Sequence, residues 1–282
     1  MATLYLVSTP IGNLGDISPR AEETLRSVDR ILAEDTRRSR LLAKKAGARA
    51  PLISLHAHNE RERSERILSW LSKGEDLALL SDAGTPLVSD PGGRTVAGVI
   101  EAGHRVVPIP GPSAVLSALI ASGLPSERFA FLGFPEKKGK ERESFFERVA
   151  LSGETVVLFE SPRRLVTLLI ALAERCGGDR RGVVARELTK VYEEIRRGTL
   201  TELAAHYREF SPRGEVTLVI APAEEILDDA AQAKAARALC NELLDKGMKP
   251  SEVARKVAAS LALPRNEAYR IVHKLERDRT PG

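Results

Sequence analysis

The chain has 282 residues but only two cysteines, Cys176 and Cys240, which stand far apart. This usage does not suggest a structural disulfide and fits a reducing compartment. The sequence has no CxxC, HExxH or histidine cluster and so gives no sign of a metal site. No apolar run approaches the roughly 18 residues of a membrane helix, and the first residues lack the basic region of a signal peptide. We therefore expect a cytoplasmic protein without a metal and without a membrane.

Three widespread motifs are also missing. No GxGxxG follows a strand, and neither GxxxxGK[ST] nor GxSxG occurs. These absences argue against an ordinary dinucleotide-binding fold, a P-loop ATPase and an α/β-hydrolase.

Short apolar segments alternate with helical patterns through the first half of the chain, which predicts a parallel sheet covered by helices. The strands expected there are residues 4–7, 30–33, 51–55, 77–80 and 105–109. Ser18-Pro19 predicts a helix start with Ser18 as its N-cap, and Thr36 is the expected cap of the next helix. Beyond a linker at residues 123–125, the expected strands are 129–134, 155–159, 182–186, 191–197 and 216–221, and the expected helices are 163–175 and 200–207. We expect an α/β fold with two α/β domains, residues 1–121 and 122–222, and a helical segment over residues 223–282.

Three loops rich in glycine and proline follow strands of the first domain, at residues 8–16, 81–93 and 110–113. A parallel sheet brings such loops to one edge, where open α/β sheets bind small molecules. Gly84 and Gly92 allow a ligand to approach the backbone, and Asp82 and Asp90 supply acceptors. Because the loops contain no Lys or Arg, we expect a zwitterionic or cationic ligand rather than a polyphosphate. The alternative is that they are ordinary turns with aspartate caps.

Two predicted helices begin with a pair of arginines, Arg37-Arg38 after Thr36 and Arg163-Arg164 after Ser161-Pro162. A helix N-terminus is the unfavourable end for positive charge. One explanation is pairing with acidic residues just upstream. The other is that the arginines and the free helix N–H groups bind the phosphates of a chain molecule. A third contact would come from a charged loop that contains Lys137, Lys138, Lys140 and Arg142.

The excess of basic over acidic residues lies in the last fifty residues of the chain. Residues 231–282 hold 11 Lys and Arg against 6 Asp and Glu, a net charge of +5, whereas residues 1–230 hold 32 against 33. Two helices are expected there, residues 251–261 and a second one capped by Asn266, with a short turn between them. The pattern fits either a nucleic-acid-binding helix-turn-helix or a docked helical hairpin.

Seven motifs occur in order along the chain: YLVSTPIGNLGDIS (5–18), EDTRRSRLL (34–42), LLSDAGTPLVSDPG (79–92), PGPSA (110–114), FLGFPEKKGKER (131–142), FESPRRL (159–165) and RELTKVYEEIRRG (186–198). Together they resemble the ribosomal RNA small subunit methyltransferase I family, which belongs to the tetrapyrrole-methylase-like group. The resemblance is close over residues 1–222 and looser over the C-terminal segment.

The resemblance implies two α/β domains of the tetrapyrrole-methylase-like type, with S-adenosylmethionine between them and a small helical extension. It implies methyl transfer to the ribose 2′-hydroxyl of a cytidine in small-subunit (16S) ribosomal RNA by a cytoplasmic homodimer. The cofactor residues that it implies are Ser81, Asp82, Ala83, Gly84, Thr85, Pro86, Ser89, Asp90, Pro112, Ser113, Ala114, Glu160, Ser161, Thr217 and Leu218. The residues expected to contact RNA are Arg37, Arg38, Lys137, Lys138, Lys140, Arg163, Arg164 and Arg186.

A ribose hydroxyl is a poor acid, so a base that accepts its proton would assist such a reaction. Several carboxylates stand in the matching motifs, and the sequence does not choose among Asp16, Glu34, Asp35, Glu160 and Glu187. Two rival functions remain at this stage. One is a tetrapyrrole methyltransferase of the same fold, and the other is a ligand-sensing regulator that binds DNA through residues 251–277.

Overall fold

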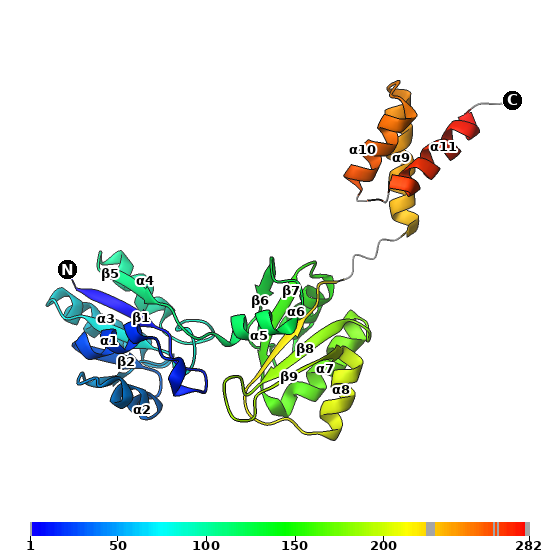
Figure 1. The fold of residues 1–282 in the computed structure, drawn as a ribbon. Helices are drawn as coiled ribbons and strands as arrows, with labels where there is room; N and C mark the ends of the chain where they lie inside the picture. The colour runs from blue at the N-terminus through cyan, green and yellow to red at the C-terminus, as the bar shows by residue number, and fades with distance from the viewer. Residues whose placement is uncertain (1, 224–228, 262, 264, 280–282) are drawn as a thin grey trace. The chain divides into compact units, whose positions relative to one another are not determined.

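The computed structural model describes residues 2–223, 229–261, 263 and 265–279. The chain divides into two compact units, residues 1–223 and the C-terminal remainder. The first unit contains two sheets with their own helices, and the second is helical (Figure 1).

The first sheet has five parallel strands in the order β3-β2-β4-β1-β5. They are β1 (Thr3–Val7), β2 (Arg30–Ala33), β3 (Leu52–Ser54), β4 (Leu77–Leu80) and β5 (Arg105–Ile109). All four residues of the central strand β4 are buried, as expected for a parallel strand covered on both faces. The predicted parallel sheet is confirmed, and its carboxyl ends share one edge.

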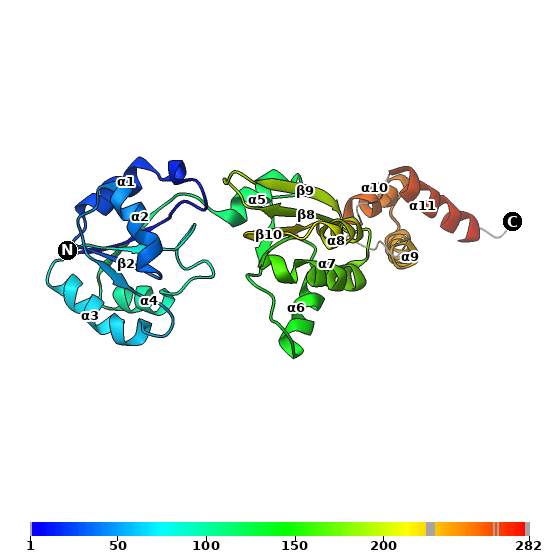
Figure 2. The same ribbon diagram turned by 90° about the horizontal axis from the view of Figure 1, so that it is seen from below.

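Helices cover both faces of this sheet (Figure 2). One face carries α1 (Pro19–Ser27) and α2 (Thr36–Ala46), and the other carries α3 (Glu60–Ser72) and α4 (Gly93–Glu101). Ser18 caps α1 as expected, because its hydroxyl accepts a hydrogen bond from the Ala21 N–H at 3.1 Å. α2 ends at Gly47, whose φ of 72° is the left-handed conformation that glycine adopts easily. Its cap is Asp35 and not Thr36, because the Asp35 carboxylate accepts from the Arg37 N–H.

The second sheet is mixed, in the order β6-β7-β10-β8-β9, with only the β6–β7 pair parallel. Its strands are β6 (Phe129–Phe131), β7 (Thr155–Glu160), β8 (Arg181–Arg186), β9 (Glu194–Thr199) and β10 (Val216–Ile220). One face packs against α6 (Lys140–Leu151), α7 (Pro162–Cys176) and α8 (Leu200–Glu209). The other packs against α5 (Ala114–Ser122), through Val115, Ala118 and Leu119.

Several details differ from the sequence-based expectations. The expected strand at residues 191–197 begins only at Glu194, because residues 187–193 form a turn. Residues 140–142 belong to α6 and not to a loop. The expected boundary between residues 121 and 122 falls in the last turn of α5, a helix that packs on the second sheet, so the boundary itself remains a prediction.

The C-terminal unit contains α9 (Asp229–Asp245), α10 (Pro250–Ser260) and α11 (Arg265–Arg279). Small apolar side chains form its core, among them Cys240 on α9, Val253 and Val257 on α10, and Val272 on α11. α11 begins at Arg265, so the expected cap Asn266 lies inside the helix. In the described part of the chain, no helix has the length and apolar character needed to cross a bilayer.

Candidate active site at the carboxyl edge of the first sheet

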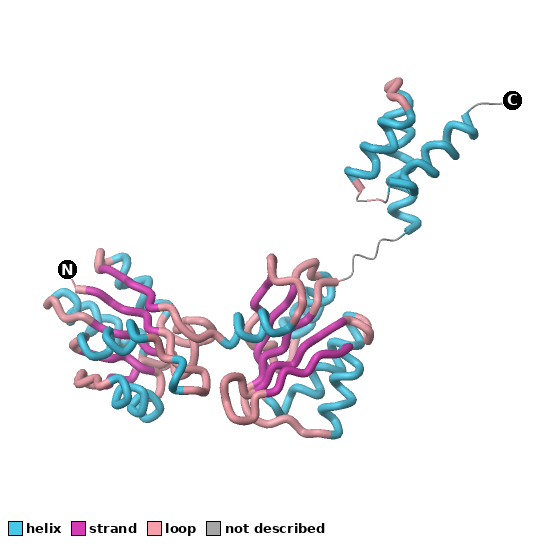
Figure 3. The backbone as a smooth tube through the Cα atoms, in the orientation of Figure 1, coloured by secondary structure: helices cyan, strands magenta, loops and turns pink. Residues whose placement is uncertain are grey.

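The three glycine- and proline-containing loops meet at the carboxyl edge of the first sheet (Figure 3). The Thr9 N–H donates to the Gly84 carbonyl at 2.8 Å, and the Gly84 N–H donates back to the Thr9 carbonyl at 3.0 Å. The Thr9 hydroxyl donates to the Ser81 carbonyl at 3.1 Å. The Thr85 hydroxyl donates to the Pro112 carbonyl at 3.3 Å. The expected juxtaposition of residues 8–16, 81–93 and 110–113 is therefore present.

The loop after β4 holds an uncommon backbone conformation. Gly84 has a φ of 83°, and a Cβ at this position would lie 3.3 Å from the Ile11 side chain. Leu87 and Ser89 also have positive φ, 70° and 67°, although they are not glycines. Each such residue costs on the order of 1 kcal/mol or more, and such strain is concentrated at functional sites. The loop is therefore built for a purpose other than reversing the chain.

Three carboxylates gather around this loop: Glu34, Asp82 and Asp90. Asp82 is anchored, because its Oδ1 accepts a hydrogen bond from the Asp35 N–H at 3.0 Å. Asp90 is half-buried, and its Oδ2 is buried without a hydrogen-bond partner among the described residues. Burial raises the pKa of the Asp90 carboxyl, a hydrogen bond with Ser81 opposes this, and the charge of Asp82 raises the pKa further.

Glu34 follows β2 directly, and its environment is similar. Burial raises the pKa of the Glu34 carboxyl, and the negative charges of Asp90 and Asp82 raise it further. Arg38 and His56 act in the opposite direction without cancelling the shift. A carboxyl whose pKa is raised by burial and by neighbouring negative charges, as for Glu34 and Asp90, is typical of functional sites.

The other candidate catalytic residues in the first sheet's loops are placed differently. Asp35 caps α2 and pairs with the Arg37 guanidinium, with Nη2 at 2.8 Å from Oδ2. This hydrogen bonding holds the pKa of the Asp35 carboxyl well below its usual range. Asp16 is exposed at the end of the short 3-10 helix Leu14–Asp16. Pairing with an acidic residue just upstream, one of the two expected explanations, therefore applies to Arg37. The Arg38 side chain is 71% exposed, and its Nη1 lies 3.7 Å from Asp82 Oδ2.

Glu160 ends β7 in the second sheet and is buried. Its Oε1 accepts from the Ser161 N–H and from Arg164 Nε, both at 2.7 Å. Its Oε2 is buried with no hydrogen-bond partner among the described residues. Arg164 also donates to the Pro135 carbonyl, so its guanidinium is engaged inside the protein. This differs from the expected RNA contact by Arg164 and matches the alternative of upstream pairing.

Two further expectations change in the second sheet. Leu218 is completely buried in the core beneath α7 and α8, so its side chain offers no surface to a ligand. Thr217, which precedes Leu218 on β10, is also buried. Its partners on the neighbouring strands are Phe159 on β7 and Ala185 on β8. Arg186 pairs with Glu194 and is 23% exposed, which leaves little of it for RNA.

The turn between β8 and β9 contacts the first loop of the first sheet. The Asn13 N–H donates to the Thr189 hydroxyl at 3.0 Å, and a Cβ on Gly12 would lie 2.4 Å from Lys190 Cγ. Glu187 holds this turn in place, because its Oε1 accepts from Lys190 Nζ at 2.8 Å and from the Glu215 N–H at 3.1 Å. These hydrogen bonds lower the pKa of the Glu187 carboxyl. Glu187 is therefore committed to the shape of the turn.

Sequence reasoning missed the contacts that join the two sheets' loops. Besides the Asn13–Thr189 hydrogen bond, a Cβ on Gly133 would lie 3.5 Å from Ser89 Oγ. The signal that the sequence offered for these contacts was a glycine in each of two loops, Gly12 and Gly133. Partners that are 176 residues apart, as Asn13 and Thr189 are, leave no local pattern.

The remaining basic candidates lie on the surface of the second sheet's helices and loops. Arg163, in the first turn of α7, is exposed, as are Lys137, Lys138 and Lys140. Arg142 donates to the Glu136 carbonyl at 2.7 Å and lies over the Phe146 ring, so it has a structural role.

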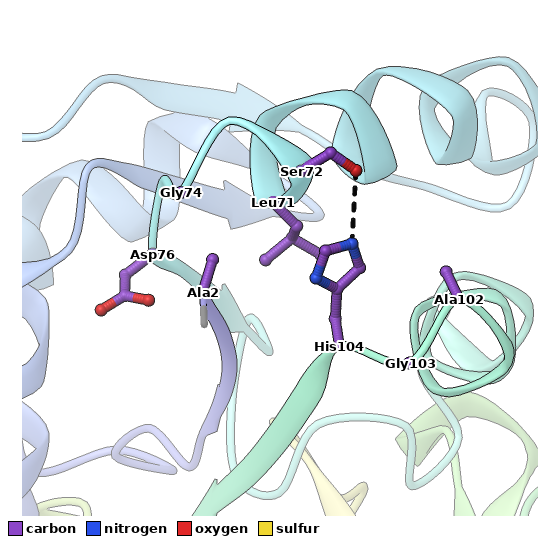
Figure 4. A pocket seen from close by; sticks show the side chains of 8 residues that line it. All are labelled: Ala2, Leu71, Ser72, Gly74, Asp76, Ala102, Gly103 and His104. Atoms are coloured by element: carbon purple, nitrogen blue, oxygen red, sulfur yellow. Dashed lines mark hydrogen bonds between the residues drawn. The ribbon is translucent and has the colours of Figure 1, made fainter.

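A cavity of about 420 Å³ lies at the opposite, amino edge of the first sheet (Figure 4). It is lined by residues that precede β1, β4 and β5, including Ala2, Asp76 and His104, with His104 Nε2 3.4 Å from Ser72 Oγ. Open α/β sheets bind ligands at the carboxyl ends of their strands, so this cavity serves below as a control region. In the described part of the chain, no three His, Cys, Asp or Glu side chains group together as metal ligands would.

Comparison with known proteins matches this architecture to one family. The family model described as Tetrapyrrole (Corrin/Porphyrin) Methylases matches residues 3–204. A protein of Synechocystis sp. named Ribosomal RNA small subunit methyltransferase I is 43% identical over 99% of this chain and 100% of its own length. A Bacillus subtilis protein of the same name is 41% identical over 97% of this chain and 94% of its own length.

The chain is a member of the ribosomal RNA small subunit methyltransferase I family of tetrapyrrole methylases. The family resemblance read from the seven motifs is thus confirmed. Solved structures of this fold include a cobalt precorrin-4 methyltransferase, with a TM-score of 0.60 and 18% identity over 78% of this chain and 94% of that one. That likeness shows the fold of the family and no more.

The raised pKa of Glu34 has a consequence for stability. A carboxyl whose pKa is higher in the folded state stabilises the fold fully below its ordinary value of 4.5, and this contribution is lost as pH rises through the folded pKa. We expect Glu34→Gln to melt at a higher temperature than the wild type at pH 7, with the difference shrinking as the pH falls below about 4.5. The measurement is thermal unfolding against pH. Glu101→Gln, an exposed carboxylate at the end of α4, is the control. A lower melting temperature for Glu34→Gln at pH 7 would contradict the assignment.

Proposed function

We propose that this protein methylates small-subunit ribosomal RNA with S-adenosylmethionine as the methyl donor. The observation that carries the proposal is the group formed by Glu34, Asp82 and Asp90 beside loops that contain no Lys or Arg. The substrate is proposed from the relatives, which are named as methyltransferases of that RNA.

The residues at the carboxyl edge fit this donor. S-adenosylmethionine, when bound, supplies a methyl group on a positively charged sulfur. Asp82 and Asp90 provide negative charge for such a ligand, and the buried, unpartnered Asp90 Oδ2 is free to accept a hydrogen bond. Gly84, with positive φ and no side chain, lets this loop pack closely against Ile11 of the first loop. The binding residues in this proposal are Ser81, Asp82, Ala83, Gly84, Thr85, Pro86, Ser89, Asp90, Pro112, Ser113, Ala114, Glu160, Ser161 and Thr217.

Charge complementarity at Asp82 can be tested without disturbing the fold. Asp82→Asn keeps an oxygen that accepts from the Asp35 N–H but removes the negative charge. We expect its affinity for S-adenosylmethionine to fall about tenfold, and its affinity for the uncharged thioether S-adenosylhomocysteine to fall less, as calorimetry would measure. Ser72→Ala, in the cavity at the amino edge, should change neither affinity. Equal losses for both ligands, or none, would count against a cationic ligand at this edge.

We further propose that the methyl acceptor is the 2′-hydroxyl of a cytidine and that Glu34 receives its proton. Asp35, Glu160 and Glu187 are each committed to internal hydrogen bonds, whereas no hydrogen bond of the Glu34 side chain to a described residue is present. Its raised pKa makes the Glu34 carboxylate a stronger base than an ordinary glutamate. The loops around Glu34 would align the acceptor hydroxyl in line with the methyl donor.

Glu34→Gln should separate proton transfer from binding. We expect kcat for methyl transfer to fall by about 10²-fold, typical of the loss of a general base, while the calorimetric affinity for S-adenosylmethionine stays within about twofold of the wild type. The control is Glu101→Gln. An unchanged kcat would show that Glu34 is not the proton acceptor.

RNA contact is proposed for exposed cations, of which Arg37 and Arg38 lie beside the carboxylates and the others lie away from them: Arg37, Arg38, Lys137, Lys138, Lys140 and Arg163. A positive surface can bind phosphates while the acidic loops hold the donor. A homodimer and a cytoplasmic location complete the proposal, on the strength of the family alone.

The experiment that tests the function offers labelled S-adenosylmethionine together with small ribosomal subunits, with porphyrinogen or with duplex DNA. We expect label in small-subunit RNA only, at a cytidine 2′-O position mapped by mass spectrometry. Arg163→Glu should lower this labelling at least tenfold without changing donor affinity, because it places a negative charge on the RNA-facing surface. Arg105→Glu, an exposed site at the amino edge of the first sheet, is its control.

Two outcomes would overturn the function. Label in porphyrinogen would make the protein a tetrapyrrole methyltransferase. Sequence-specific binding of duplex DNA without methyl transfer to any RNA would make it a regulator.

A further inference from the structure

The C-terminal unit carries a cavity that the proposed function does not use. Its volume is about 250 Å³, and it is lined by Ser251, Glu252 and Arg255 on α10 and by Tyr269 on α11. The cavity therefore lies where the two helices of the expected helix-turn-helix face each other.

Tyr269 is not among the described residues that form the core of this unit. The buried cluster is made of small aliphatic side chains, cysteine and alanine, whereas Tyr269 is 40% exposed. Its ring stacks on that of His273, one turn further along α11, with centroids 6.3 Å apart and an interplanar angle of 26°. An exposed ring held in place by a second ring beside an arginine is the arrangement on which unpaired bases stack.

The charge of the unit favours a polyanion. Residues 231–282 hold 11 Lys and Arg against 6 Asp and Glu. On α10 and α11, the exposed cations include Arg255, Lys256, Arg270 and Lys274. Among the described residues that line the cavity, the acidic one is Glu252, three residues before Arg255 on α10. A surface with this balance attracts the phosphates of a nucleic acid.

We propose that this cavity binds an unpaired nucleotide of single-stranded RNA, with the base stacked on Tyr269 and the phosphate held by Arg255. The inference rests on the proposed function, which makes RNA the macromolecular substrate. Single-stranded RNA is favoured over a duplex because paired bases present no free face to an aromatic ring. His273 acts as a positioning residue, since it supports the Tyr269 ring from the side opposite to the base.

The test uses the full-length protein and a short, labelled single-stranded RNA, with affinity measured by fluorescence anisotropy over a series of salt concentrations. Tyr269→Ala should weaken binding about tenfold with an unchanged salt slope, because it removes stacking and no charge. Tyr269→Phe keeps the ring and should bind within about twofold of the wild type. Arg255→Gln should weaken binding and lower the salt slope by about 1, as expected for one lost phosphate contact.

Lys246→Gln is the matched control for charge. Lys246, in the turn directly after α9, pairs with Glu242 and does not line the cavity, so this change should leave affinity nearly unaltered. Circular dichroism of each variant checks that the helices are retained. If Tyr269→Ala does not keep its helices, the comparison of Arg255→Gln with Lys246→Gln decides.

Wild-type affinity in folded Tyr269→Ala, equal losses in Arg255→Gln and Lys246→Gln, or tighter binding of duplex DNA than of single-stranded RNA would each overturn the inference. Calorimetric binding of S-adenosylmethionine and the site of methylation report on the proposed function separately. The inference therefore fails on its own if the protein methylates small-subunit RNA but Tyr269→Ala binds RNA normally.

Discussion

Mutual repulsion between carboxylates at one edge of a parallel sheet is the constraint on which the site depends. Glu34 follows β2, and Asp82 and Asp90 lie in the loop after β4, so the parallel topology brings them together whatever their sequence distance. Burial raises the pKa of Glu34 and of Asp90, and the neighbouring negative charges raise both further. A fold selected for stability alone would not keep such a group, so the repulsion points to a positively charged ligand.

The backbone around these carboxylates is held from both sheets. Within the first sheet, the paired hydrogen bonds of Thr9 and Gly84 join two loops. From the second sheet, the turn at Thr189 reaches Asn13 through a hydrogen bond of 3.0 Å. The strained conformations of Leu87 and Ser89 persist only because the surrounding contacts determine them. A binding site preformed in this way loses less conformational entropy when its ligand arrives.

Elements with strong local signals were predictable from the sequence. β4 was expected at its observed bounds because four apolar residues stand between polar ones, and α1 because Ser18-Pro19 is a typical helix start. The start of β9 was expected at residue 191 but lies at Glu194. Val191 and Tyr192 are residue types common in strands, although here they are 92% and 75% exposed in a turn. That turn is determined by Glu187, Lys190 and Glu215, whose pairing depends on tertiary structure.

The candidate site, too, was predictable from the sequence only in part. The meeting of the three loops at one edge followed from the parallel direction of the strands, which the alternation of strands and helices implies. The roles of the arginines did not follow, because whether an arginine at a helix start faces solvent or a carboxylate depends on side-chain packing. Arg163 and Arg164 are neighbours in sequence, but only Arg164 reaches Glu160 and the Pro135 carbonyl.

Charge in this chain is separated according to ligand, and the separation is itself a physical argument for two ligands of opposite sign. The three loops at the carboxyl edge contain acidic side chains and no Lys or Arg, whereas most of the proposed RNA-binding cations lie on α7, in the loop before α6 and on the C-terminal helices. Arg37 and Arg38 on α2 are the exceptions, because they lie beside Asp35 and Asp82. A polyanion placed against the acidic loops would be repelled, and a small cation would gain little from the basic surfaces. A protein that transfers a group from a cationic donor to a nucleic acid needs both kinds of surface, and at α2 the two meet, where Arg38 lies beside Asp82.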